Sequence, residues 1–519
     1  MGGQIKDYEG RRISGDISRD VAMFREIFAK DSVLRVREFH SSGDIDADCA
    51  ALYFDGMVNS ALINDSIIKP MVGLGVLPPD TDGGFKGDKG GAGGEIDLAD
   101  IIMRRVLYSN EAAATEDMAE MLRGMLYGDT LLLIDGCPRA LVLNTKGWKT
   151  RGISEPEDER ILEGPREGFE ESVMTNLALL RRKLQTPDLC AEFMRVGRRT
   201  DTKVYICYLG SLVSEKALAE LKKRLGEIDI DGIFDTNYIS ELTTDRKYSL
   251  FRSAGSTERP DIVAARLLEG RIAVMCDGSP MVLTLPYLFS ENFQSDEDYY
   301  QNFLTASVAR ALRYICFFIS VCIPAVYVAI TVFHRRLLPT PLILSVAAAR
   351  EGVPFSSAVE CLMLIIIFEI LKEAGVRTQQ SLGQALSIVG GLVVGQAAVE
   401  AKIVSAPMLI IVALSGIAGL MIPRLRAAVF YLRLGFVLAA CTLGLYGVMT
   451  VLFALLGRIA SLSSFGIDAT PALSDPSPQN LKDTAVRAHM SFMRTRPAFN
   501  KNKRRMRNEN IRGGEIGEE

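Results

Sequence analysis

A short run of glycine and proline is the first stretch whose residue types could do chemistry. "GPREGF", residues 164–169, precedes a segment with helical periodicity, and free backbone N–H groups at a helix start can bind a phosphate. A phosphate loop usually continues into Lys and Ser or Thr. Here Pro165 lacks an N–H group, Glu167 adds negative charge, and no Lys-Ser/Thr pair follows. The pattern therefore favours a structural joint made of Gly164, Pro165, Arg166, Glu167 and Gly168, with Arg166 paired to an acidic neighbour.

The remaining reactive residue types form no recognisable catalytic or metal-binding set. The three histidines, His40, His334 and His489, are far apart, and the chain has neither a G-x-S-x-G nor an H-E-x-x-H motif. Nine cysteines are scattered singly without a C-x-x-C pair, which is typical of reduced thiols. A glycine-rich cluster at residues 82–95 has no strand before it, so we interpret it as a flexible loop. We therefore predict no catalytic residue, no metal and no cofactor.

Length and apolar runs divide the chain into a soluble part and a membrane part. Of its 519 residues, 48% are hydrophobic and 24% are charged. Residues 314–333 contain no charge, and at about 1.5 Å per residue they match a hydrocarbon core of about 30 Å. Further apolar runs cover residues 378–399, 403–422 and 434–457, with a shorter one between Glu360 and Glu369. The N-terminus has no apolar signal segment, so the part before the first run is expected to be cytosolic.

The expected soluble part contains an internal duplication. "YGDTLLLIDGCPRALVLNTKGW", from Tyr127, and "EGRIAVMCDGSPMVLTLPYLF", from Glu269, share the pattern D-G-x-P between apolar strands. Each predicts a β-hairpin, with Gly136 or Gly278 at positive φ. Upstream, "ALYFDGMVN" and "ICYLGSLVS" each join a strand to a helix. The fold class predicted is therefore an α/β region of two related subdomains followed by an all-α polytopic membrane domain.

The domain boundaries follow from these patterns. The segment between the repeats carries a buried helical stripe with basic residues in its last turns, as expected for a connecting helix. We predict an N-terminal arm (1–30), a first α/β subdomain (31–155), the connecting helix with the GPREGF motif (156–188), a second α/β subdomain (189–305), a transmembrane domain (306–465) and a basic cytosolic tail (466–519).

Several stretches resemble the A subunit of the GerA-type spore germination receptors. They include "EPEDERILEGPREGFEESVMTNLALLRRKL", "STERPDIVAARLLEGRIAVMCDGSP", "LPYLFSENFQSDEDYYQNF" and "YVAITVFHRRLLPTPLILSVAAAREGVPF". The resemblance runs in order from about Val33 to Asp483. After the last apolar run, "SFGIDATPAL" delays the first proline to Pro471, which departs from the family pattern and concerns only the local path of the chain.

The resemblance implies a location, partners and an activity. Members of this family lie in the inner membrane of bacterial spores, act with a transporter-like B subunit and a lipoprotein C subunit, and release ions in response to nutrients. The A subunit is implied to form homo-oligomers that conduct cations. Related accessory spore proteins share the architecture. For this chain the resemblance implies contact with membrane lipid and no nucleic-acid partner.

Ionisable side chains within a membrane domain are functional candidates because their burial in lipid carries a high free-energy cost. One helix face between residues 360 and 373 could line a pore, with an apolar constriction followed by acidic rings. This face consists of Leu362, Ile365, Ile366, Glu369 and Glu373. Alternatively, Glu369 and Glu373 lie at the cytosolic end and pair with Lys372 or Arg377. The other intramembrane charges are Glu360, Glu400 and Lys402, of which the last two fit an interfacial position equally.

Helix packing and topology give a final set of expectations. The spacing Gly391-x-x-x-Gly395 predicts close approach of two helices. A cytosolic N-terminal part and a basic tail require an even number of spans, whereas the chain has five apolar runs. We predict four spans, with either 355–371 or 378–399 being short, re-entrant or interfacial. The second choice places Arg424, Arg426 and Arg433 outside, against the positive-inside rule.

The sequence therefore predicts a germination receptor subunit that responds to nutrients and conducts cations as an oligomer. One alternative is a secondary transporter of a nutrient, which would require inverted repeats in the membrane part. A second is a scaffold that positions the other subunits without conducting. A third is an enzyme in the soluble part that uses Arg166 and the D-G-x-P loops.

Overall fold

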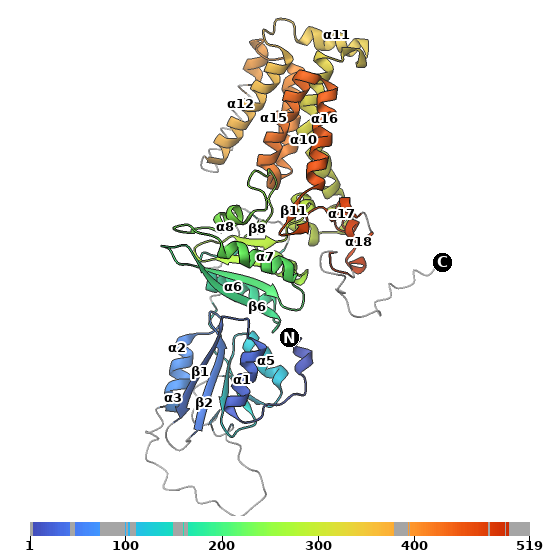
Figure 1. The fold of residues 1–519 in the computed structure, drawn as a ribbon. Coiled ribbons are helices and arrows are strands. Elements are labelled where there is room, and N and C mark those ends of the chain that lie inside the picture. The colour runs from blue at the N-terminus through green and yellow to red at the C-terminus, as the bar shows by residue number, and fades with distance from the viewer. Residues whose placement is uncertain are drawn as a thin grey trace, which may run out of the picture.

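The computed structural model describes residues 4–41, 47–72, 99, 102–103, 111–148, 159, 164–377, 393, 395–475, 478–493 and 495–497. These residues form two α/β subdomains and a helical bundle that follow one another along a long axis (Figure 1). The first subdomain lies at the end opposite the bundle, and the second lies between them.

The first subdomain is a five-stranded antiparallel sheet with helices on both faces. Alternate residues of β2 point to opposite faces, as the strand period requires: Ala50 and Leu52 join the apolar cluster with α1 and α5, whereas Cys49 joins the cluster with α2, η2 and α3. The strand order is β1-β2-β4-β5-β3. The elements are α1 (Ile17–Ile27), β1 (Leu34–Ser41), β2 (Ala47–Phe54), α2 (Ser60–Ile63), η2 (Asn64–Ile68), α3 (Lys69–Val72), β3 (Ala112–Thr115), α5 (Met118–Leu126), β4 (Thr130–Ile134) and β5 (Ala140–Leu143).

The second subdomain repeats this strand order. Its sheet runs β6-β7-β9-β10-β8, so each strand occupies the position of its counterpart in the first sheet. The predicted D-G-x-P hairpins are β4–β5 and β9–β10, and Gly136 (φ 77°) and Gly278 (φ 92°) both have positive φ. The elements are β6 (Leu189–Val196), β7 (Thr202–Leu209), α7 (Glu215–Gly226), α8 (Thr236–Thr243), β8 (Gly255–Thr257), α9 (Pro260–Leu268), β9 (Ile272–Cys276), β10 (Val282–Leu285), η3 (Phe289–Phe293) and η4 (Asp296–Tyr299). The prediction of two related α/β folds with antiparallel hairpins is confirmed.

The segment expected as an N-terminal arm packs on the first sheet. The 3-10 helix η1 (Ile5–Tyr8) and α1 bury Tyr8, Val21 and Phe24 in the same cluster as β2 and α5. The side chain of Asp16 caps α1 by accepting hydrogen bonds from Ser18 N and Arg19 N. These residues therefore extend the first subdomain.

The bundle is formed by helices that alternate in direction between two ends. We call the end beside the second subdomain the near end and the opposite one the far end (Figure 1). At the near end, Arg424 donates a hydrogen bond to the Glu291 carbonyl at 3.0 Å. At the far end, Gly444 lies against Phe333 and His334. The helices are α10 (Phe303–Val332), η5 (Arg335–Leu337), α11 (Thr340–Ala349), α12 (Ser357–Arg377), α14 (Ala406–Leu420), η6 (Pro423–Leu425), α15 (Arg426–Leu443) and α16 (Leu445–Ala460).

The predicted count of four spans is not confirmed. Among the described residues, two helical stretches are long and apolar enough to cross a membrane, Phe303–Val332 and Pro423–Leu443. Three apolar helices, α11, α14 and α16, are shorter, and α12 has 21 residues but carries charges. The run 434–457, expected as one span, is divided at Gly444 (φ 62°) into the antiparallel helices α15 and α16. That expectation is wrong because a uniformly apolar composition does not reveal a turn.

The structure also shows where Arg424, Arg426 and Arg433 lie, the arginines whose predicted location conflicted with the positive-inside rule. Arg424 and Arg426 lie at the near end, on the side of the α/β subdomains. Arg433 lies inside the bundle, 3% exposed. The run 378–399 falls almost entirely outside the described residues, and so does Gly391 of the predicted packing motif. Its partner Gly395 lies beside Leu409 of α14.

Candidate functional site

The GPREGF segment lies against the second subdomain and leads into α6 (Val173–Lys183). At its C-terminal end, Phe169 N–H donates to the Glu258 carbonyl at 2.7 Å, and the N–H of the next residue, Glu170, donates to Asn176 Oδ1 at 2.8 Å. The Pro165 carbonyl accepts from Nη2 of the buried Arg259 at 3.1 Å. These interactions hold the segment against the second subdomain and α6.

The charged residues of this motif face different surroundings. Glu167 forms ion pairs with Lys183 at 2.9 Å and with Arg182 at 3.4 Å, both in the last turn of α6. Arg166 is exposed. Burial raises the pKa of Glu167, but the hydrogen bonds and charges of Lys183 and Arg182 outweigh it, so the pKa lies below its ordinary value. The acidic member of the motif is therefore held ionised against α6.

Helix α6 contacts both subdomains. Leu177 and Leu180 pack in the apolar cluster of the second subdomain, whereas Ala178 packs in that of the first. Arg181 forms a fully buried ion pair with Asp31, which precedes β1. The Arg181 guanidinium also lies 4.1 Å from the ring centroid of Phe54 in β2. The helix thus connects two sheets that share no strand.

The α12 helix carries the candidate pore residues on more than one of its sides. Ile365 is fully buried against the other helices of the same chain, whereas Ile366 is 49% exposed. Val359, Ile370 and Glu373 are exposed on the same side as Ile366. Leu362 is half-buried at the edge of that side. The structure therefore separates Ile365 from the exposed face of α12, which consists of Val359, Ile366, Ile370 and Glu373.

The acidic residues of α12 have different environments. Glu369 is half-buried and forms an ion pair with Lys372, three residues further on, as in the alternative considered from the sequence. Glu360 is fully buried, and its carboxylate accepts hydrogen bonds from Ser405 at the start of α14. Glu400 and Lys402 are exposed, and Lys402 lies against Gly352 at the far end of the bundle.

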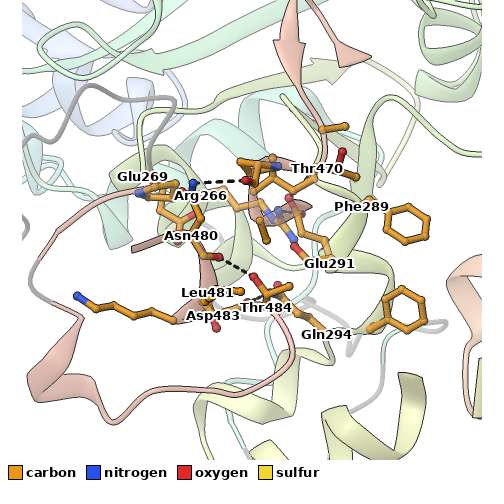
Figure 2. Close-up of a pocket in the computed structure, with 18 of the residues that line it drawn as sticks. Arg266, Glu269, Phe289, Glu291, Gln294, Thr470, Asn480, Leu481, Asp483 and Thr484 are labelled. Atoms are coloured by element: carbon orange, nitrogen blue, oxygen red, sulfur yellow. Dashed lines mark hydrogen bonds and ion pairs between the residues drawn. The ribbon is translucent and has the colours of Figure 1, made fainter. Parts of the chain in front are cut away.

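A cavity of about 640 Å³ lies where the second subdomain, the bundle and the tail meet. Figure 2 shows Arg266 of α9 and Glu269, the residue directly after α9, beside this cavity. Phe289 and Glu291 from η3 and Asn480 to Thr484 from the tail lie around the same space. Its apolar wall includes Tyr314 and Phe317 of α10 and Ile459 of α16. We call the ion pairs and side chains around this cavity the junction.

Buried ion pairs connect the three parts of the junction. Glu291, 1% exposed, pairs with Arg266 and Arg271 of the second subdomain. Arg424 of η6, just before α15, pairs with Asp296 at 3.0 Å. In α10, Arg310 binds Asp298 at 2.7 Å and Asp483 of the tail at 2.5 Å. Helix α10 and the segment that leads into α15 are therefore tied to the subdomain by charged contacts.

The pKa values of two titratable groups of the junction, Asp298 and Tyr299, are shifted in opposite directions from their ordinary values. Burial would raise the pKa of Asp298, but hydrogen bonds from Arg313 and Arg310 outweigh it and hold the pKa below its ordinary value. Burial and the neighbouring Asp483 raise the pKa of Tyr299, so its hydroxyl stays neutral and donates to Asp483 at 2.6 Å. The junction therefore keeps its charges paired. Among the described residues, no group of three His, Cys, Asp or Glu side chains could hold a metal ion.

Residues 22–499 match the profile of the family described as Bacillus/Clostridium GerA spore germination protein. The chain belongs to this GerA family. It is therefore a member of the family that contains the A subunits of spore germination receptors, as the resemblance predicted.

Similar proteins cover most of this GerA-family chain. It is 38% identical over 477 residues to spore germination protein KA of Bacillus subtilis (strain 168), covering 92% of this chain and 85% of that protein. It is 37% identical to the uncharacterized membrane protein YfkQ of the same organism, covering 95% and 93%. The crystal structure of the N-terminal domain of the A subunit of the Bacillus megaterium spore germinant receptor GerK3 matches with 30% identity and a TM-score of 0.39, over 54% of this chain and 97% of that one.

Sequence patterns did not reveal several residues that the GerA-family structure brings together. Arg433 of α15 donates to the Ser320 carbonyl at 2.9 Å and the Ser415 carbonyl at 3.1 Å, inside the bundle. Only its position directly before an apolar run marks it as unusual. The junction residues Glu291, Asp298 and Asp483 lie between 12 and 173 residues from their arginine partners, and no local pattern indicates these contacts.

Proposed function

We propose that this chain is a germinant receptor subunit that assembles with copies of itself into a cation channel of the spore inner membrane. Nutrient binding, held by a transporter-like B subunit, shifts the channel from closed to open, and a lipoprotein C subunit completes the receptor. The α/β subdomains lie on the cytosolic side and perform no catalysis. As with any two-state protein, the nutrient must favour the open state by its difference in affinity for the two states.

The face of α12 that no described residue covers is the observation that carries this proposal. Glu369 and Glu373 lie on a helix of membrane length, and Ile366 and Ile370 are exposed in the single chain. The carboxylate of Glu373 on the exposed face would be unfavourable in contact with lipid. A ring of identical subunits around a water-filled axis would instead give it water and attract cations. In that ring Leu362 and Ile366 form the apolar constriction.

The position of α12 at the edge of the bundle supports the same arrangement. Helices α10, α14 and α15 pack around one another, whereas α12 contacts them along one side only (Figure 1). Gly416 of α14 lies against the ring of Phe368, where a Cβ atom would approach within 2.4 Å. This close contact fixes which side of α12 faces its own chain and leaves the other side for neighbouring copies.

The junction provides a route between the α/β part and the bundle. Because Glu291 and Asp298 bind arginines that belong to different parts of the chain, a displacement of the second subdomain changes contacts of α10 and α15. The GPREGF segment and α6 act as the joint that holds the two subdomains in one orientation.

The experiment is a conductance measurement on the purified full-length chain in planar bilayers, alone and with its two partner subunits. We expect a cation-selective conductance whose resting leak increases when Leu362→Ala widens the constriction. Ile410→Ala removes the same number of atoms from the exposed side of α14 and should leave the leak unchanged. No conductance in any of these preparations would overturn the channel, and saturable nutrient accumulation in vesicles would then support the transporter alternative.

A further inference from the structure

The loop that follows α8 presents basic and apolar side chains together at the near end of the bundle. It reads "TDRKYSLFRS", residues 244–253. We propose that this loop rests on the headgroup layer of an anionic lipid bilayer, with Tyr248 and Leu250 reaching toward the acyl chains and three cations binding lipid phosphates. The proposal goes beyond the channel and rests only on the bundle being embedded in a membrane.

The position of the loop follows from its contacts with the bundle. Phe251 is buried in the same apolar cluster as α10 and α14, and its ring meets Phe289 edge to face with centroids 5.3 Å apart. Asp245 Oδ2 accepts a hydrogen bond at 3.0 Å from Ser463, which lies directly after α16. Figure 1 places α8 on the bundle side of the second sheet. The loop is therefore located where the helices would leave the hydrocarbon.

The base of the loop is held in one shape by polar contacts. Arg224 of α7 donates to the Thr243 carbonyl at 2.7 Å and pairs with Asp245. The hydroxyls of Thr244 and Ser253 lie 3.0 Å apart and close the base. Ser249 N–H donates to the Arg246 carbonyl at 3.1 Å, which tightens the tip. Because these bonds order the loop in advance, little conformational entropy is lost when it binds.

The tip exposes apolar surface that no described part of the chain covers. Tyr248 is 98% exposed and Leu250 is 47% exposed, while Leu242 adds a third exposed apolar side chain from the last turn of α8. A tyrosine combines an apolar ring with a hydroxyl, and this suits the boundary between water and lipid. The apolar side chains therefore fit the interfacial layer better than open water.

The positive charge of the loop favours binding to an anionic surface. Arg246, Lys247 and Arg252 are exposed, and the acidic residue of the loop, Asp245, is turned inward to Arg224 and Ser463. Basic residues close to an anionic leaflet are attracted by its negative surface potential, and this attraction is screened by salt. Three cations around an apolar tip match a lipid surface, whereas a neighbouring protein would need a complementary acidic face.

The test uses tryptophan fluorescence, because the chain contains a single tryptophan, Trp148, in the first subdomain. The full-length chain with Tyr248→Trp and Trp148→Phe is reconstituted in vesicles of phosphatidylglycerol brominated near the headgroup end of the acyl chains. We expect its emission to be quenched by about half, since interfacial side chains lie within about 5–10 Å of that depth. Quenching should be much weaker in brominated phosphatidylcholine and should decrease at high salt.

Two controls make each outcome decisive. The wild-type chain should remain unquenched in every vesicle, because Trp148 packs in the first subdomain, which lies at the end of the molecule opposite the bundle. If Trp148→Phe impairs folding, Tyr248→Trp alone gives the same information above the constant signal of Trp148. Flotation of the vesicles reports separately on membrane embedding. If the Tyr248→Trp chain floats with the vesicles but is not quenched, the inference about the loop is overturned while the channel proposal is unaffected. Equal quenching in both lipids has the same consequence. Loss of flotation contradicts the membrane embedding on which the channel depends.

Discussion

The carboxylate of Glu360 accepts hydrogen bonds from both the backbone N–H and the hydroxyl of Ser405. Glu360 lies near the far end of α12, and Ser405 is the N-cap residue of α14. Both side chains are buried, and Arg350 Nη2 lies 4.0 Å from the second carboxylate oxygen. The helix that carries the proposed constriction is thus fixed to the rest of the bundle two residues before Leu362.

Loss of this contact should loosen α12. Glu360→Leu leaves the first N–H group of α14 and the Ser405 hydroxyl without an acceptor, which costs about 1–3 kcal/mol for each buried group. We expect a lower melting temperature of the detergent-solubilised chain and a larger resting leak in bilayers. Glu360→Gln keeps an acceptor of the same shape and should be milder in both measurements. Equal behaviour of the two variants would contradict a role for the hydrogen bonds.

The buried Arg181–Asp31 pair should dominate the stability of the contact between the subdomains. Nε and Nη1 of Arg181 have no hydrogen-bond partner among the described residues, so the guanidinium depends on Asp31 and on the Phe54 ring. Arg181→Met leaves Asp31 buried and unpaired, and we expect a loss of about 3–5 kcal/mol. The double variant with Asp31→Leu should recover part of it. Thermal unfolding would contradict this account if the double variant were less stable than Arg181→Met.

The junction should weaken in acid. Since the pKa of Asp298 in the folded chain lies below its ordinary value of 3.8, the unfolded chain binds a proton first as the pH falls. The stability that Asp298 provides is therefore complete above the ordinary pKa and is lost as the pH falls through the lower folded value.

Unfolding of the wild-type chain between pH 7 and pH 3 measures this loss. Asp298→Asn should be less stable than wild type at pH 7 and should lose less further stability in acid. Parallel acid curves for the two chains would assign the acid sensitivity to other groups.

The buried thiols of the α/β part should be unreactive in the folded chain. Burial raises the pKa of Cys49 and of Cys207 to about 12 each, so at pH 8 only about one thiol in ten thousand is ionised. We expect a thiol reagent to leave both residues unmodified in the native protein and to modify both after denaturation, as read by mass spectrometry. Rapid modification of either thiol in the native protein would show that the burial is incomplete.

Local chemistry made part of the structure predictable. The D-G-x-P hairpins follow from turn residues that need positive φ, and the family resemblance rests on contiguous motifs. The order of strands within each sheet depends on pairings between distant segments, which composition does not record. The turn at Gly444 lies in a run whose residues are apolar on both sides, so no change of pattern marks it.

The candidate pore shows a further limit of sequence patterns. A helical period places Leu362, Ile365 and Ile366 near one another, but it cannot say which side of α12 packs against its own chain. That choice depends on Phe368 fitting against Gly416, a contact between helices that are far apart in sequence. For the same reason the Arg181–Asp31 and Arg310–Asp483 pairs appear only once the chain is folded.

Accessibility of α12 to water tests the central claim most directly. Ile366→Cys is placed in the full-length chain in lipid bilayers, and Phe453→Cys on α16, on the side of the bundle away from α12, is the matched control. A charged, membrane-impermeant thiol reagent should modify the Ile366→Cys chain and reduce its conductance while leaving the Phe453→Cys chain unmodified. Modification of Ile366→Cys by a lipid-soluble reagent alone would place this face of α12 against acyl chains and contradict the channel.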